Sequence, residues 1–146
     1  MLKGIPPCIS PDLIKIMMEM GHDDELILAD ANFPAASNAT RLIRYDGIKI
    51  PELLEAILLF FPLDDYKPKP VTLMSVTRGQ NVKPVIWNQY RDIIKKHDKN
   101  FTAFDYMDRT DFYERARKAY AIVATSETAY FANIILKKGV IRDKTS

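Results

Sequence analysis

Cysteine and histidine are scarce in this chain of 146 residues, which holds one cysteine, Cys8, and two histidines, His22 and His97. A single cysteine excludes an intramolecular disulfide bond and fits a reducing compartment. Zinc sites need clusters of cysteine and histidine at short spacings, and the sequence has no such cluster. We therefore expect no metal site in this protein.

An excess of charge of one sign and long apolar runs are also missing. The chain carries 21 basic and 19 acidic residues, so its net charge of +2 gives no reason to expect a nucleic-acid or membrane partner. No apolar run approaches the roughly 20 residues that span a bilayer, and no signal peptide is recognisable at the N-terminus. The sequence favours a cytoplasmic protein, and its length favours a single domain over residues 1–146.

Glycine is sparse as well, with five residues in the whole chain. The sequence contains neither a Walker A motif nor a Gly-x-Gly-x-x-Gly loop, which excludes the phosphate cradles of those types. It also lacks the Gly-x-Ser-x-Gly turn that presents the nucleophile of many hydrolases. We therefore expect no nucleotide or other cofactor.

The sequence does contain a regular alternation of apolar strands and amphipathic helices. Strands are expected at residues 25–30, 41–45, 71–77, 101–106, 120–125 and 130–136. Helices are expected to begin at Ser10-Pro11 and at Pro51 and to span residues 84–97 and 111–118, with a loop at 32–38 and an exposed connector at 64–70. This order predicts an α/β fold with a mixed, largely parallel sheet. The turn at 126–128 is too short for a helical crossover, so the last two strands are expected to form a C-terminal antiparallel pair.

Residues 21–34 join a helix end to a strand and a loop. Gly21 follows the first helix and is expected to end it in the left-handed conformation. His22 then lies just outside the helix C-terminus, and Asp30 lies where an apolar run ends. Eight residues separate this histidine from this aspartate, so an extended chain would place them up to roughly 26–29 Å apart. They can meet only if the loop folds back or if two chains share the site.

Of three further polar residues, Arg109 and Asn133 have both a structural and a functional interpretation, whereas His97 has only a structural one. His97 ends an amphipathic helix beside two lysines and is expected to be a solvated surface residue. Arg109 lies close to two aspartates and fits either a surface ion pair or a ligand contact. Asn133 interrupts an apolar strand, either at a sheet edge or as an anchor for a ligand hydroxyl. Together with His22 and Asp30, Arg109 and Asn133 suit a neutral polyol ligand and proton transfer, but they do not define a reaction.

Several segments resemble those of a known family. They are MLKGIPPCISPDLIKIMMEMGH, GHDDELILADANFP, IPELLEAILLFFPLDDY, FYERARKAYAIVAT and ANIILKKGV. They cover nearly the whole chain in order and resemble the RbsD/FucU family of sugar mutarotases, in its L-fucose mutarotase branch. The resemblance implies an RbsD-like three-layer fold. It also implies an isomerase that interconverts the α and β anomers of L-fucose by acid/base-assisted ring opening and closure.

The resemblance assigns roles residue by residue. His22 matches the catalytic proton donor, Asp30 a sugar-binding carboxylate, and Arg109 the basic binding residue of the fucose branch. The ribose branch has what looks like a histidine in place of this arginine, which favours L-fucose as the substrate. The other substrate-binding positions match the triplet Phe131, Ala132 and Asn133.

Phe131 departs from the family pattern, which has Tyr-Gly-Asn or Tyr-Ala-Asn at this triplet. The ring is kept but the phenolic hydroxyl is missing, so one sugar hydrogen bond worth about 0.5–1.5 kcal/mol is expected to be lost. Tyr130 is adjacent, but successive residues of a strand face opposite sides. Tyr130 is therefore not expected to substitute for the missing hydroxyl.

The resemblance further implies a homo-oligomer, typically a decameric ring with sugar sites where subunits meet. The segment from Tyr130 to Val140 is expected to contribute to a neighbour's pocket as well as to its own sheet. Two alternatives remain open, a D-ribose pyranase-type mutarotase and a non-catalytic monosaccharide-binding protein. The binding protein would use Asp30, Arg109 and Asn133 but would not need His22 as a titrating group.

Overall fold

The computed structural model describes residues 1–143 as six strands and five helices. In chain order they are α1 (Pro11–Glu19), β1 (Glu25–Ala29), α2 (Ala35–Asn38), β2 (Leu42–Tyr45), α3 (Ile50–Leu58), β3 (Val71–Met74), α4 (Ile86–His97), β4 (Asp105–Met107), α5 (Arg109–Lys118), β5 (Ala121–Thr125) and β6 (Ile134–Lys137). The first helix begins as expected, because the Ser10 hydroxyl accepts the N–H of Leu13 at 3.1 Å and Pro11 occupies the first turn.

The strands form one mixed sheet in the order β2-β5-β1-β6-β3-β4. The pairs β2–β5, β5–β1 and β3–β4 are parallel, which confirms the largely parallel sheet that the sequence predicts. Strand β6 is antiparallel, as expected, but its partners are β1 and β3. The expected pairing of the last two strands with each other is wrong, because β1 lies between them and residues 126–133 carry the chain past it.

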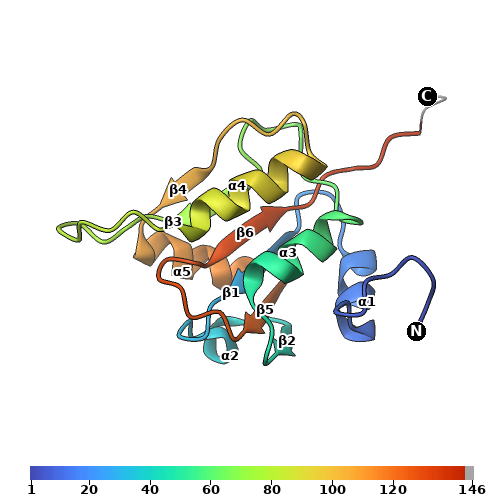
Figure 1. The fold of residues 1–146 in the computed structure, drawn as a ribbon, viewed down its shortest axis with the longest axis horizontal. Helices are drawn as coiled ribbons and strands as arrows, with labels where there is room; N and C mark the ends of the chain where they lie inside the picture. Colours follow the sequence, from blue (N-terminus) through green and yellow to red (C-terminus); the bar gives the residue numbers. More distant parts are fainter. Residues whose placement is uncertain (144–146) are drawn as a thin grey trace.

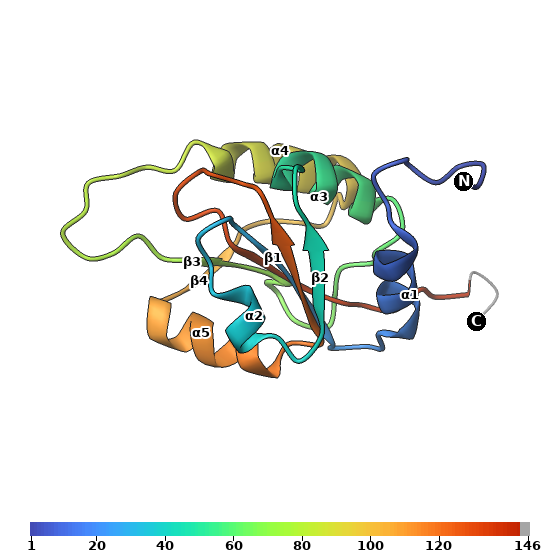
Figure 2. The ribbon, with the colours of Figure 1, turned by 90° about the horizontal axis from the view of Figure 1, so that it is seen from below.

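Helices cover both faces of the sheet and give the fold its three layers (Figures 1 and 2). In Figure 2, α3 and α4 lie on one face, α2 and α5 lie on the other, and α1 lies at one end of the sheet. Strand β1 is buried from both sides, since Leu26 and Leu28 join one apolar cluster while Ile27 and Ala29 join the other. This double burial explains its continuous apolar run. None of the helices within residues 1–143 has both the length and the apolar character of a membrane span.

Two regions differ from the expected secondary structure near the ends of strands. The expected strand at residues 130–136 is shorter, since β6 begins only at Ile134 and Phe131 has a positive φ of 55°. A positive φ at an aromatic residue interrupts the extended chain, so Tyr130 to Asn133 form an irregular segment. The expected loop at 32–38 contains the short helix α2.

The turn after α1 is also built differently from the expectation. The helix ends at Glu19 with Met20 in an extended conformation, and Gly21 does not adopt a positive φ. Asp23 takes the left-handed conformation instead, with φ of 72°. The Gly21 N–H donates to Asp24 Oδ2 at 2.7 Å. A side-chain acceptor thus stabilises this turn, and no glycine in the left-handed conformation ends the helix.

Gly139 lies where the chain after β6 passes the residues that follow α3. Its N–H donates to the Pro62 carbonyl at 2.7 Å, and a Cβ atom at this position would lie 2.5 Å from the Leu63 carbonyl oxygen and 2.9 Å from Asp64 Cα. These neighbours are backbone atoms, which cannot rotate away. The close approach fixes Asp64 against the end of the sheet.

Replacing Gly139 by alanine is expected to destabilise the protein by about 1–3 kcal/mol, because the added methyl group would force two backbone segments apart. Chemical denaturation followed by circular dichroism measures this change. Gly21→Ala is the matched control, since the nearest atom to its added Cβ is 3.8 Å away and its φ is not positive. A Gly139→Ala protein as stable as this control would show that the backbone at Leu63 and Asp64 can shift to accommodate the methyl group at little energetic cost.

Candidate active site

A cavity of about 270 Å³ opens at the edge of the sheet where β1 and β3 end. Residues that follow these strands line it together with the first turn of α5 and the segment before β6. They are Asp30, Asn32, Phe33, Met74, Thr77, Arg109, Tyr113, Ala129, Tyr130, Phe131 and Asn133. The carboxyl ends of parallel strands are the usual place for a ligand site in an α/β sheet. The structure thus brings four of the sequence-predicted site residues to one cavity, namely Asp30, Arg109, Phe131 and Asn133.

Asp30 is held at the end of β1 by hydrogen bonds with Asn32 and Asn133, which also line the cavity. Its Oδ1 accepts the N–H of Asn32 at 3.0 Å, and its own N–H donates to Asn133 Oδ1 at 2.8 Å. Burial raises the pKa of the Asp30 carboxyl above its ordinary value, while the N–H groups of Asn32 and Phe33 oppose this and the charge of Glu127 adds to it. The amide of Asn133 is therefore fixed by the backbone of Asp30, and the carboxyl is left at the cavity wall.

Arg109 is the first residue of α5, and the helix begins there because the Asp108 carboxylate accepts the N–H of Asp111 at 2.8 Å. Its guanidinium carbon lies 5.3 Å from the centre of the Tyr113 ring. Within residues 1–143 no carboxylate lies within ion-pair distance of this guanidinium, although two aspartates are close in sequence. The surface ion pair that the sequence allowed is thus not formed, and the donors of Arg109 remain available to a ligand.

Tyr113, Met74 and Thr77 line the cavity but were not recognised in the sequence. The Tyr113 and Phe33 rings contact each other with centres 5.1 Å apart and form an aromatic wall below Arg109. Tyr113 follows Arg109 by four residues, so the spacing of neighbours on one helix face could have identified it. Met74 and Thr77 are brought in by the end of β3, which no local motif indicates.

Tyr130 and Phe131 both line the cavity, contrary to the expectation that they face opposite sides. That expectation assumed a strand, and the positive φ of Phe131 removes the strand alternation. Ala132 is fully buried and does not line the cavity, and its carbonyl oxygen accepts the Tyr90 hydroxyl at 2.7 Å. The triplet thus presents Phe131 and Asn133 to the cavity and turns Ala132 into the protein.

His22 lies at the opposite end of β1 and is not part of this cavity. Its Nε2 lies 2.9 Å from Oδ1 of Asp64, whose side chain is fully buried although the sequence placed it in an exposed connector. Burial alone would raise the pKa of Asp64, but the hydrogen bonds from His22 and from the N–H groups of Tyr66 and Lys67 outweigh it and lower the pKa. The centre of the Tyr66 ring lies 4.9 Å from the centre of the His22 imidazole. The His22 side chain remains 34% exposed.

The same place holds the one group of possible metal ligands found within residues 1–143. Atoms of His22, Asp23 and Asp64 lie within 4.8 Å of one another. Since His22 Nε2 and Asp64 Oδ1 are already bonded to each other at 2.9 Å, a metal ion would have to replace that bond. The geometry is that of an imidazole held by a carboxylate.

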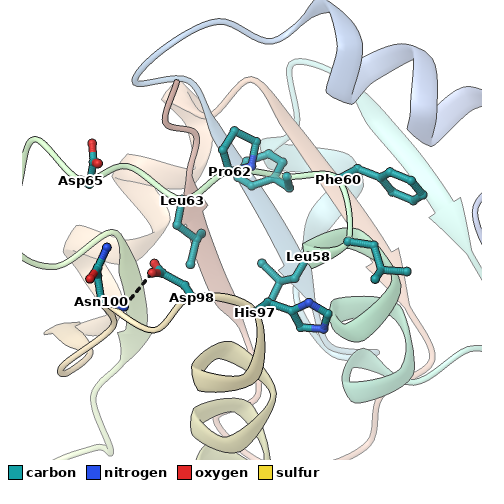
Figure 3. A pocket seen from close by; sticks show the side chains of 10 residues that line it. Leu58, Phe60, Pro62, Leu63, Asp65, His97, Asp98 and Asn100 are labelled. Carbon is teal, nitrogen blue, oxygen red and sulfur yellow. Dashed lines mark hydrogen bonds between the residues drawn. The ribbon is translucent and has the colours of Figure 1, made fainter. Parts of the chain in front are cut away.

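A second hollow, of about 330 Å³, lies between the chain that follows α3 and the end of α4 (Figure 3). In this hollow the backbone N–H of Asn100 donates to Asp98, and the imidazole Nε2 of His97 lies 3.1 Å from Glu55 Oε1 without a hydrogen bond to it. His97 is only 15% exposed, so the expectation of a solvated histidine is wrong. This hollow lacks the convergent free polar groups of the cavity at Asp30.

Known proteins match this chain over nearly its whole length. L-fucose mutarotase of Histophilus somni is 49% identical over 140 residues, which cover 96% of this chain and 97% of the relative. The crystal structure of the fucose mutarotase in complex with L-fucose from Streptococcus pneumoniae is 55% identical and superposes with a TM-score of 0.90, over 97% of this chain and 100% of that one. FucU from Bifidobacterium longum is 46% identical with a TM-score of 0.93, over 96% and 100% of the two chains.

The family model described as the RbsD / FucU transport protein family matches residues 3–141. This match covers both ends of β1, all the residues that line the cavity, and the pair of His22 and Asp64. Sequence, fold and family model agree, and the chain belongs to the RbsD / FucU family.

Proposed function

We propose that this protein is an L-fucose mutarotase, an isomerase that interconverts the α and β anomers of L-fucose. The observation that carries the proposal is the cavity in which Asp30, Arg109 and Asn133 meet, in a chain 55% identical to a fucose mutarotase crystallised with L-fucose. A carboxyl, a guanidinium and an amide suit the hydroxyl groups of a neutral sugar. Phe131 and Tyr113 supply ring faces for its apolar side.

Mutarotation needs two proton transfers at the anomeric centre. A proton leaves the anomeric hydroxyl, the bond between the anomeric carbon and the ring oxygen breaks, and the ring oxygen gains a proton. The open-chain aldehyde then rotates, and the same hydroxyl attacks the carbonyl from either face with the proton transfers reversed. An imidazole can serve both as the base and as the acid for these transfers near neutral pH.

His22 is the residue to which we assign these proton transfers. The pKa of Asp64 is lowered, so its carboxylate accepts a hydrogen bond and the proton lies on His22 Nε2. The other ring nitrogen, Nδ1, is then the atom that takes a proton from the sugar or returns one. Asp64 orients the imidazole through this hydrogen bond.

The distance between His22 and the cavity supports a site shared between two copies of the chain. The two lie at opposite ends of β1, and the partly exposed imidazole of one copy is free to approach the cavity of another. We propose a homo-oligomer of the decameric ring type, in which residues 130–140 also contact a neighbour's pocket. In a closed symmetric ring every subunit makes the same two interfaces with its neighbours, so every shared site is equivalent.

The remaining expectations form part of the same proposal. The whole chain is expected to act as one domain, in the cytoplasm, with no cofactor and with Asp30, Arg109 and the Phe131–Asn133 triplet as the binding residues. Ala132 would contribute to sugar binding only through its backbone, which links Phe131 to Asn133. A D-ribose pyranase-type activity and simple sugar binding are the outcomes against which L-fucose mutarotation is tested.

Magnetisation-transfer NMR on L-fucose tests the function directly. The protein is expected to accelerate exchange between the two anomers, and to do so less efficiently for D-ribose. His22→Gln is expected to lower exchange by about 10²–10⁴-fold with little change in L-fucose affinity, because it removes a proton-transfer group. His97→Gln is the matched control and should keep wild-type exchange. Near-full activity in His22→Gln would favour a site without this histidine.

Mixing two inactive variants tests whether the site is shared. His22→Gln and Arg109→Ala each remove one side of the proposed site, and both side chains are exposed enough to be replaced without disturbing the core. After verified subunit exchange, about one quarter of the sites should hold both intact residues and recover activity. Light scattering should show a large homogeneous oligomer. A monomer, or no recovery after mixing, contradicts the shared site.

Tyr130→Phe tests whether the neighbouring phenol replaces the hydroxyl that Phe131 lacks. Because both side chains line the cavity, removal of the Tyr130 hydroxyl is expected to raise the KM for L-fucose about two- to tenfold, as loss of one hydrogen bond would. Tyr120→Phe removes a phenol that contacts Glu19 outside the cavity and should leave KM unchanged. Equal KM values for the two variants would show that Tyr130 does not bind the sugar.

A further inference from the structure

The segment Phe131–Asn133 presents two binding groups to the cavity from a backbone that is neither helix nor strand. Phe131 has a φ of 55°, which is uncommon for an aromatic residue and persists only where surrounding groups hold it. Asn133 is held from its side chain, because its Oδ1 accepts the N–H of Asp30. The carbonyl groups of Phe131 and Ala132 need partners of their own.

Two side chains of α4 provide these partners. The indole Nε1 of Trp87 donates to the carbonyl oxygen of Phe131 at 2.8 Å, and the hydroxyl of Tyr90 donates to that of Ala132 at 2.7 Å. Tyr90 is fully buried, and burial raises the pKa of its hydroxyl well above the ordinary value. The phenol is therefore protonated near neutral pH and remains a hydrogen-bond donor.

Neither ring lines the cavity. Trp87 and Tyr90 are absent from the residues that line the cavity, so they contact the segment from behind. They are three residues apart and lie on the same face of α4, which packs beside α3 over one face of the sheet (Figure 1). One face of α4 thus carries two ring donors that bind the two successive carbonyl groups of Phe131 and Ala132.

We propose that Trp87 and Tyr90 are positioning residues for sugar binding, which fix the carbonyls of Phe131 and Ala132 and so aim Phe131 and Asn133 into the cavity. This assignment rests on the proposed function for the identity of the sugar. Loss of either donor lets the segment relax toward an ordinary φ, which moves the Phe131 ring and the Asn133 amide. The proton transfers at His22 do not depend on these bonds.

Tyr90→Phe and Trp87→Phe test the proposal, with Tyr45→Phe as the matched control. The Tyr45 hydroxyl also binds a backbone group, the N–H of Ser10 at 2.6 Å, but it lies outside the cavity. Three quantities are measured for each variant: Tm, the KM and kcat for L-fucose anomer exchange, and hydrogen–deuterium exchange of the peptide covering residues 129–134. The isotope exchange is measured without sugar.

The two α4 variants are expected to raise KM about three- to tenfold with kcat within about twofold, and to speed isotope exchange in the 129–134 peptide. Tyr45→Phe should lower Tm by a similar amount without either effect. A KM within about twofold of wild type in both α4 variants overturns the proposal, as does a raised KM without faster isotope exchange. If wild-type protein does not accelerate anomer exchange, the proposed function fails, and the isotope exchange alone decides whether α4 positions the segment.

Discussion

The double burial of β1 is the constraint on which the site depends. The strand pairs with β5 on one side and β6 on the other, and helices cover both of its faces, so it cannot bend or shorten. Its five residues span roughly 17 Å, with the imidazole of His22 before its first residue and the carboxyl of Asp30 after its last. Within one chain this strand therefore separates His22, to which we assign the proton transfers, from Asp30 and the other residues that we propose bind the sugar. The strand also holds His22 and Asp30 in fixed positions. In a shared site, His22 of one copy would therefore meet the cavity of another copy in a reproducible geometry.

The sequence predicted those parts of the molecule that local patterns encode. The apolar run before Asp30 identified a strand buried on both faces, and Ser10-Pro11 identified a helix start that the structure confirms. Asn133 is recognisable in the sequence as a polar residue within an apolar strand, and the family resemblance predicts both Arg109 and Asn133 as binding positions. The structure places both at one cavity with Asp30. It also leaves His22 away from Asp30, which is one of the two arrangements that the chain length allowed.

Features that depend on contacts between distant segments were not predictable in this way. Asp64 begins a charged stretch two residues after Pro62 and has the local signature of a surface residue, yet its N–H donates to the Lys137 carbonyl and its side chain is buried beside His22. Phe131 occurs among strand-forming residues, yet it has a positive φ, and its carbonyl oxygen accepts the indole N–H of Trp87 on α4. In both cases the residue makes a hydrogen bond to a partner dozens of residues away in the sequence, which no local pattern indicates. The pairing of β6 with β1 and β3 has the same origin.

The place of β6 in the sheet has a consequence for biosynthesis. Within residues 1–143, β6 is the strand that links β2-β5-β1 to β3-β4, and it is the last strand to leave the ribosome. Until then the nascent chain carries two partial sheets whose inner edges, β1 and β3, have unpaired backbone groups and strongly apolar side chains. Such edges can pair wrongly with those of other nascent chains, and non-local strand pairing is slow. Completion of the sheet, and with it of the cavity beside Asn133, therefore waits until β6 has emerged and paired with β1 and β3.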